Sequence, residues 1–217
     1  MNTKTRKLVT LAMLSAVAFV VMWVGRLPIA PVPFLKYDPK DIVIVIGGFL
    51  YGPLSSALIS LVVSLIEMVT VSDTGVIGLA MNVLSTCSFA CVAAFIYKRK
   101  PTLQSAVIGL VCGVAAMTGV MLLWNYLITP LYMQGTSREA VAAMLIPVFL
   151  PFNLLKGGMN LAVTLLAYKP VVGALRKARL VPPSEHSPKG RSVGVAALSV
   201  AVLATCIISV LVFCKVI

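Results

Sequence analysis

The sequence has few charges and almost no side chains suited to acid–base chemistry. Only 11% of its 217 residues are charged, six are acidic, and one, His186, is a histidine. A soluble domain of this size needs more polar surface than that. No phosphate-binding glycine loop, no His-Glu-x-x-His pair and no Gly-x-Ser-x-Gly turn occurs, and these are the motifs that would indicate an enzyme. The composition therefore argues against a soluble protein and against catalysis.

Long apolar runs take the place of polar surface. Sixty per cent of the residues are hydrophobic, and the mean hydropathy is +1.05. Runs without Asp, Glu, Lys or Arg cover residues 8–25, 42–66, 74–97, 101–137, 140–155 and 192–214. A membrane-spanning helix needs about 20 mostly apolar residues and satisfies its own backbone hydrogen bonds. The runs also lack the period of two of a barrel strand. We predict an all-α polytopic membrane protein, in which the five cysteines are small packing residues.

The basic residues decide how many helices the run 42–66 contains. Gly52-Pro53 interrupts this run, and proline within a helix removes a hydrogen bond and clashes with the preceding turn. With one helix here, the cluster 98–100 would lie opposite the basic N-terminus, whereas two helices place both clusters on the cytoplasmic side, as the positive-inside tendency favours. We predict two spans, the first of them short.

The resulting map has seven helices, at residues 8–25, 39–51, 53–71, 75–97, 103–128, 147–168 and 193–214. With a cytoplasmic N-terminus, the inner face collects 12 of the 18 basic residues, and the C-terminus lies outside if the last helix spans. The outer face carries the segments 26–40, 72–74 and 130–146. We predict a membrane domain over residues 1–180, a cytoplasmic linker over 181–192, and an additional transmembrane helix over 193–217.

Four polar side chains near the outer ends of helices are candidates for binding a ligand: Asn82, Asn125, Asn153 and Lys156. Asn153 and Lys156 are three residues apart and share a helical face. A carboxamide pairs well with the edge of a flat heterocycle, and a lysine beside it can donate to a ring carbonyl. The alternative is that the asparagines bond between helices while Lys156 extends to the headgroups. We favour binding for Asn153 with Lys156, and both interpretations stay open for Asn82 and Asn125.

Two further observations concern energy and packing. A proton-driven carrier would usually carry carboxylates within its spans, and only Glu67 qualifies, so another subunit is expected to supply the energy. Ala12 and Ala16 form a small-x-x-x-small pair that allows close helix approach. Gly109 and Gly113 have the same spacing, so without further evidence the alanine pair indicates internal packing.

Several stretches of the first 180 or so residues resemble the substrate-binding S-components of energy-coupling-factor vitamin transporters, and in particular the riboflavin-specific branch. They are residues 34–41 (FLKYDPKD) leading into 46–53 (IGGFLYGP), Asn125-Tyr126 followed by residues 130–132 (PLY), and residues 151–157 (PFNLLKG). The last stretch is the most specific, and the second is shared more widely among S-components.

The resemblance implies a six-helix fold with an outward-facing pocket for riboflavin, no cofactor, an embedded coupling subunit and two cytoplasmic ATPases. It implies that Asn125, Asn153 and Lys156 bind the isoalloxazine ring and that Asn82 lies in the pocket wall. The outer segment with Tyr37 and Asp38 would close over the ligand. Ala12 and Ala16 become the surface that docks on the coupling subunit. The seventh helix departs from the six-helix pattern.

Riboflavin is flat and uncharged, so it needs amide partners and apolar contacts but no buried ion pairs. Two alternatives stay open. One is an S-component for another vitamin, such as thiamine, biotin or a pteridine. The other is a structural membrane protein that shares only the scaffold.

Overall fold

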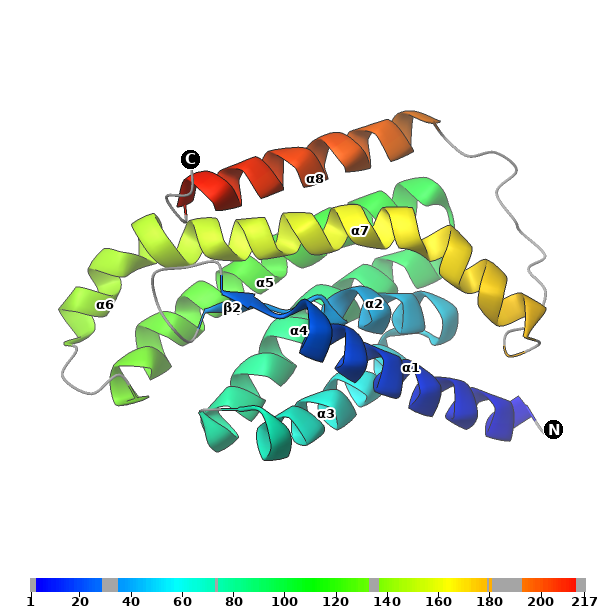
Figure 1. Cartoon of the computed structure of the whole chain (residues 1–217), viewed down its shortest axis with the longest axis horizontal. Coiled ribbons are helices and arrows are strands. Elements are labelled where there is room, and N and C mark those ends of the chain that lie inside the picture. The colour runs from blue at the N-terminus through cyan, green and yellow to red at the C-terminus, as the bar shows by residue number, and fades with distance from the viewer. Residues whose placement is uncertain are drawn as a thin grey trace.

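The structure, a computed structural model, describes residues 3–28, 35–72, 74–132, 137–178, 180 and 193–213. Its elements in chain order are α1 (Thr3–Gly25), β1 (Leu27–Pro28), β2 (Lys36–Tyr37), α2 (Lys40–Tyr51), α3 (Pro53–Thr70), α4 (Gly75–Arg99), α5 (Leu103–Tyr132), α6 (Arg138–Met144), the π-helical turn η1 (Leu145–Phe149), α7 (Leu150–Lys177) and α8 (Val193–Phe213). Within the described residues, six helical stretches are long and apolar enough to cross a membrane. The helices pack side by side in an elongated bundle (Figure 1). The predicted all-α polytopic class is confirmed.

The break at Gly52-Pro53 divides the run 42–66 into two helices, as predicted. Gly52 has φ +91°, which a residue with a Cβ rarely adopts. Pro53 occupies the first turn of α3, where its missing N–H costs nothing. A Cβ at Gly52 would lie 3.4 Å from Cδ of Lys98, so the turn abuts the basic end of α4.

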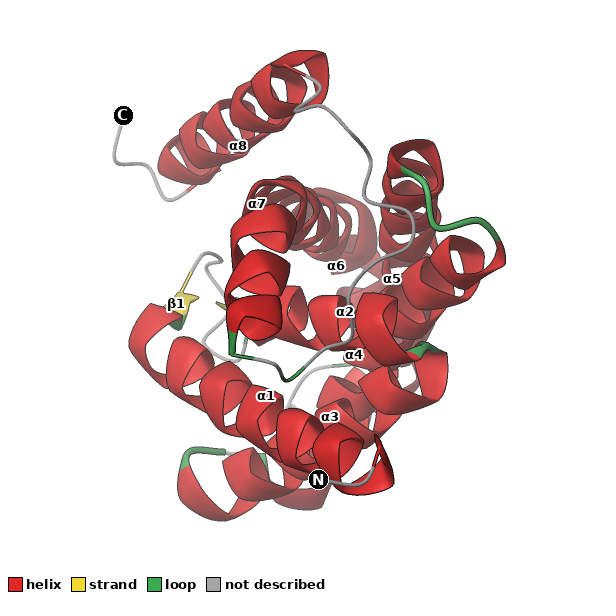
Figure 2. Cartoon of the chain, turned by 90° about the vertical axis from the view of Figure 1, so that its right-hand side faces the viewer, coloured by secondary structure: helices red, strands yellow, loops and turns green. Residues whose placement is uncertain are grey.

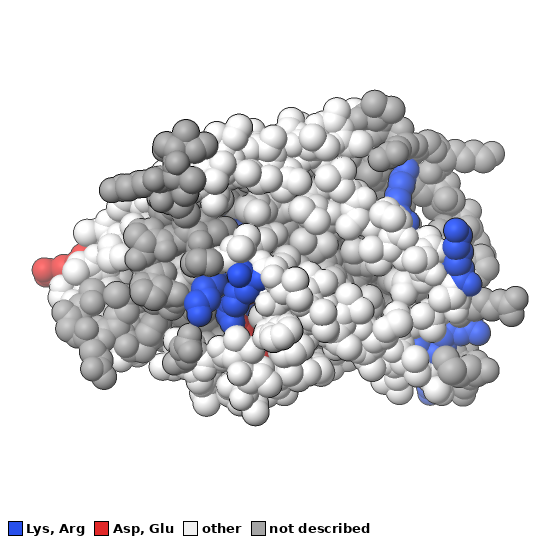
Figure 3. Space-filling model, in the orientation of Figure 1, with Lys and Arg blue, Asp and Glu red and all other residues white. Residues whose placement is uncertain are grey.

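The basic clusters meet at one end of the bundle. The ammonium of Lys7 lies 5.8 Å from the ring centroid of Tyr51, and the Tyr51 hydroxyl donates to the carbonyl of Leu180 at 3.2 Å. The start of α1, the end of α2 and Leu180, three residues past the end of α7, are therefore neighbours. Figure 3 shows Lys and Arg side chains gathered at the end where α1 begins, with one further patch near the middle of this face. The predicted sorting of the two clusters to one end is confirmed.

The helix α2 is short, as predicted, but it is too short to be the predicted span. The 12 residues of α2 rise about 18 Å, short of the roughly 30 Å of a bilayer core. Ahead of α2, β1 and β2 pair antiparallel, with Leu27 opposite Tyr37. Leu35, Tyr37 and Lys40 are buried, because the segment folds into the bundle above α2 instead of lying on its surface.

The predicted bounds of the sixth helix, 147–168, are also wrong. Helical structure begins at Arg138, passes through η1 and continues in α7 to Lys177. Ser137 accepts a hydrogen bond from the amide of Ala140 and caps the start of α6. Pro147 does not begin a helix, because it lies within the π-helical turn, a form that accommodates an interrupted hydrogen-bond ladder. Most of the expected outer segment 130–146 is therefore helical.

The last helix, α8, lies on the outside of α7 in both ribbon views (Figures 1 and 2). It runs from the end where α1 begins toward the opposite end (Figure 1). Cys206 is one of its buried residues, and a Cβ at Gly158 of α7 would lie 2.9 Å from the Cys206 sulfur. Of the residues in its most apolar stretch, only 11% are buried. The predicted additional helix is confirmed over Val193–Phe213, whereas the linker 181–192 lies outside the described residues.

Glycines bring α4 and α5 into close contact. A Cβ on Gly113 would lie 2.6 Å from the carbonyl oxygen of Phe89, and one on Gly109 would lie 2.8 Å from that of Ala93. These approaches are too close for any side chain, so the glycine pair serves internal packing. The tight α4–α5 pair forms one wall of the cavity described next.

Candidate functional site

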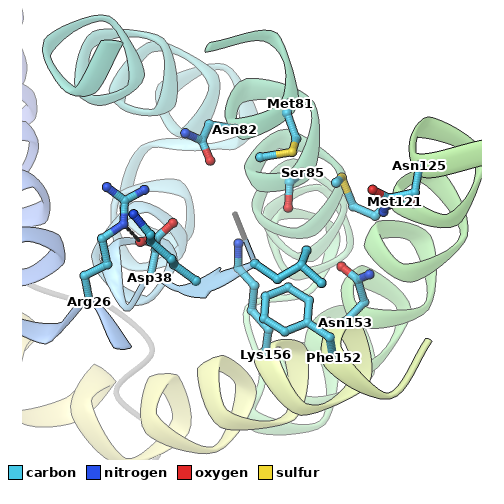
Figure 4. Close-up of a pocket in the computed structure, with 12 residues that line it drawn as sticks. Arg26, Asp38, Met81, Asn82, Ser85, Met121, Asn125, Phe152, Asn153 and Lys156 are labelled. Carbon is cyan, nitrogen blue, oxygen red and sulfur yellow. Dashed lines mark hydrogen bonds and ion pairs between the residues drawn. The ribbon is translucent and has the colours of Figure 1, made fainter. Parts of the chain in front are cut away.

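A cavity lies at the far side of the bundle from the basic end, enclosed by the end of α1, the region of β2, and helices α4, α5 and α7 (Figure 4). Twelve residues line it: Arg26, Leu35, Lys36, Asp38, Met81, Asn82, Ser85, Met121, Asn125, Phe152, Asn153 and Lys156. Five of the six residues that we predicted to bind a ligand are among them. The sixth, Tyr37, lies just behind this wall.

Two carboxamides form the α5–α7 side of the cavity. Asn125 donates to the carbonyl of Met121 at 2.7 Å and accepts from the hydroxyl of Thr129 at 2.9 Å. Asn153 donates to the carbonyl of Phe149 at 2.7 Å. Each amide is fixed by its own helix, and among the described residues the Asn153 oxygen and second N–H have no hydrogen-bond partner. The structure thus brings Asn125 and Asn153 together from separate helices (Figure 4).

Lys156 lies one turn beyond Asn153, with its ammonium directed toward the middle of the cavity (Figure 4). It is 6% exposed, and its nitrogen lies 3.7 Å from Oδ2 of the fully buried Asp41. The alternative in which Lys156 extends toward headgroups is therefore contradicted. A buried charge requires a partner, and Asp41 provides it.

A cluster of four more charged side chains includes two that line the cavity, Arg26 and Asp38, and two behind them, Lys40 and Glu67. Arg26 lies 3.1 Å from Asp38 and 2.6 Å from Glu67, and Lys40 also pairs with Glu67. Lys40 is 0% and Glu67 1% exposed. The two cations and two carboxylates balance, which makes their burial tolerable. We expected riboflavin binding not to require buried ion pairs, and the structure places this cluster beside the cavity without a ligand contact to test that expectation.

The sequence held a signal for this cluster that we did not use. Glu67 is the one carboxylate in a long apolar helix, and such a group needs a cation. Arg26 and Lys40 were the nearest unassigned cations at that end. Arg26 and Asp38 both line the cavity, joined by an ion pair (Figure 4).

Tyr37 supports the wall from behind and does not face the cavity. Its hydroxyl donates to Oδ1 of Asn160 at 3.0 Å. Burial, reinforced by the charges of Asp41 and Asp38, raises the pKa of this hydroxyl above its ordinary value. It therefore stays protonated and remains a donor, which anchors β2 to α7.

Asn82 on α4 is buried and lines the cavity beside Met81. Phe152 contributes an aromatic face to the opposite wall. Phe152 is the aromatic residue among the described residues that line the cavity.

Ala12 and Ala16 lie away from the cavity on the exposed face of α1. The neighbouring Ser15 is buried and bonds to the Leu11 carbonyl of its own helix. The alanine pair thus belongs to the outer surface, in contrast to Gly109 and Gly113. Internal packing does not explain the pair.

The cavity is narrow as it stands, at about 30 Å³. Met81 and Met121 protrude into it from α4 and α5 (Figure 4), and unbranched methionine adapts readily to a new shape. The lining offers apolar faces, amide donors and acceptors, and the lysines Lys36 and Lys156, which suits a flat, neutral, amphipathic ligand.

The fold and the site define a multi-pass, all-α membrane protein with a small-molecule pocket at one end. A family model described as "ECF transporter, substrate-specific component" matches residues 6–168. The chain belongs to this family of S-components. The match ends before α8.

Individual relatives agree with the family match. The chain is 29% identical over 181 residues to a protein of Staphylococcus aureus (strain TCH60) named riboflavin transporter RibU, which covers 80% of this chain and 94% of the relative. It is 32% identical to a protein of Bacillus subtilis (strain 168) named riboflavin transporter FmnP, over 71% of this chain and 85% of the relative. A solved structure, "Structure and mechanism of the S component of a bacterial ECF transporter", superposes with a TM-score of 0.65 at 30% identity, over 80% of this chain and 99% of that one.

Proposed function

We propose that this chain captures riboflavin at the outer face of the cell membrane, as the substrate-binding subunit of an ECF transporter. The observation that carries the proposal is the convergence of Asn125, Asn153 and Lys156 on one cavity with apolar walls. Relatives that cover most of the chain and are named riboflavin transporters support the choice of ligand.

In this proposal, Asn125, Asn153 and Lys156 contact the isoalloxazine ring, because the ring's heteroatom edge needs both donors and acceptors. Phe152 and the two methionines contact its faces. Asn82 contributes from the α4 wall. Asp38 lies in the segment that closes over the ligand, and Tyr37 holds that segment against α7.

We further infer that the chain works with an embedded coupling subunit and two cytoplasmic ATPases, which supply the energy for transport. Membership of the ECF family supports this inference. The exposed alanines Ala12 and Ala16 suit close approach of a partner helix. We therefore propose the face of α1 that carries Ala12 and Ala16 as the surface that docks on the coupling subunit.

The proposed orientation places the N-terminus in the cytoplasm. The sorting of basic residues to one end supports it, since cytoplasmic ends are enriched in Lys and Arg. The pocket then opens outward, and α8 carries the C-terminus to the outside. The proposed domain division is a membrane domain at 1–180, a cytoplasmic linker at 181–192 and an additional transmembrane helix at 193–217.

The test is flavin binding to the purified protein, measured as quenching of flavin fluorescence. Lys156→Met and Asn153→Ala are each expected to weaken binding by about 5- to 150-fold, equivalent to a loss of roughly 1–3 kcal/mol of hydrogen bonding. Ser199→Ala is the matched control, because Ser199 is buried and donates to the Val195 carbonyl within α8, far from the cavity lining.

Wild-type affinity in both pocket variants would contradict the proposed site. Mass spectrometry of the ligand extracted from purified protein identifies the vitamin independently. Recovery of thiamine, biotin or a pteridine in place of riboflavin would retain the transporter class and overturn the proposed substrate.

A further inference from the structure

Asp41 is fully buried in the first turn of α2, beneath the cavity floor, and it does not line the cavity. Its Oδ1 accepts from the hydroxyl of Thr86 on α4 at 2.7 Å. Its Oδ2 accepts from the amide of Asn160 on α7 at 3.1 Å. Two neutral donors from two different helices thus hold the carboxylate in one orientation.

Lys156 is the cation that this carboxylate faces. The Lys156 nitrogen lies 3.7 Å from Oδ2, beyond the 2.7–3.2 Å range of an N–H···O hydrogen bond. The attraction between the charges is retained, but the N–H groups of the ammonium are not donated to Asp41. They remain available to an acceptor in the cavity, toward which the ammonium points (Figure 4).

We propose that Asp41 is the positioning residue for Lys156: it neutralises and orients the ammonium without capturing its N–H groups, so that these meet a ligand acceptor. The proposal rests on the proposed function, in which Lys156 contacts the ligand. Thr86 and Asn160 are essential to the arrangement. Each donates to one carboxylate oxygen, and together they hold Asp41 in the orientation that leaves Oδ2 3.7 Å from the Lys156 nitrogen.

The same network reaches the outer segment. Asn160 accepts from the Tyr37 hydroxyl through Oδ1 while donating to Asp41 through Nδ2. The orientation of Asp41 is therefore linked to the seating of β2 on α7. A preset ammonium raises affinity because less ordering remains to occur when the ligand binds.

The experiment is a double-mutant cycle on flavin affinity, with Asp41→Asn, Lys156→Met and the combined variant. Asn is nearly isosteric with Asp, and the double variant restores charge balance. Asp41→Asn is expected to weaken flavin binding about tenfold when Lys156 is present, and less than about twofold in the Lys156→Met background, a coupling of the size typical of contacting groups. A purely structural role would weaken binding equally in both backgrounds.

A second cycle keeps the proposal falsifiable if Asp41→Asn does not fold. Thr86→Val removes one of the donors that restrain Asp41 but leaves every charge in place. It is expected to weaken binding severalfold with Lys156 present and to have no effect in the Lys156→Met background. Thr164→Val is the matched control, because Thr164 is buried on α7 with a hydroxyl that lacks a hydrogen-bond partner among the described residues.

The outcomes separate the two proposals. If Lys156→Met leaves flavin affinity unchanged, the part of the proposed function in which Lys156 contacts the ligand is overturned. If Lys156→Met weakens binding but both cycles show additive effects, only the positioning role of Asp41 is overturned.

Discussion

Removing the charge of Glu67 is expected to destabilise the protein strongly. Glu67 is 1% exposed and pairs with both Arg26, at 2.6 Å, and Lys40. In Glu67→Gln the two cations retain only Asp38, to which Lys40 is the more distant, at 3.8 Å. Breaking a buried ion pair on one side costs about 3–5 kcal/mol, which corresponds to a lowering of the unfolding temperature on the order of 10 °C for a protein of this size.

The assay is thermal unfolding in detergent, with two comparison variants. Glu67→Gln combined with Lys40→Met restores charge balance and is expected to recover most of the lost stability, because a balanced apolar replacement of a buried pair is often close to neutral. Glu139→Gln makes the same chemical change at an exposed position on α6 and is expected to shift stability by less than about 0.5 kcal/mol. Unchanged unfolding of Glu67→Gln, or no recovery in the double variant, would refute the reasoning.

Two further outcomes follow from the packing of the helices. Gly113→Val is expected to disrupt the α4–α5 contact, because even a Cβ would lie 2.6 Å from the Phe89 carbonyl oxygen. The measurement is the yield of folded, monodisperse protein, which should be lost. Gly119→Val is the control and should stay folded, because a Cβ at Gly119 meets no atom within 4 Å. Ala16→Leu is expected to abolish ATP-driven flavin uptake and co-purification with the proposed coupling subunit. Flavin affinity should stay unchanged, since Ala16 is exposed and does not line the cavity. Normal uptake would show that this face of α1 is not the docking surface.

The sequence was sufficient for the parts of the fold that depend on local chemistry. Runs of apolar residues located the spanning helices, and the Gly52-Pro53 pair located a turn that composition alone would have missed. The same is true of the amides: Asn125, Asn153 and Lys156 drew attention because polar groups are costly in a bilayer, and all three line the cavity.

What the sequence did not provide were pairings between distant segments. Arg26 and Glu67 are 41 residues apart, and Asn160 and Asp41 are 119 apart. Their contacts depend on how the segment before α2 folds into the bundle, and hydropathy carries no information on that. The helix through Pro147 was likewise truncated in the prediction, because a proline signals a break more often than a π-helical turn.

That π-helical turn changes which side chains α6 and α7 present together. An α-helix advances about 100° per residue, so positions eight apart, such as Val141 and Phe149, would be offset by about 80°. A π-turn accommodates one extra residue without the corresponding rotation, so about 100° is subtracted from this offset. The two side chains then lie within roughly 20° of each other. Both are fully buried, in one cluster with Leu35, Tyr37 and Phe152. Deleting a single residue between 145 and 149 would therefore rotate α6 against α7 and withdraw Val141 from the seat of β2, although every residue of the pocket itself would be retained.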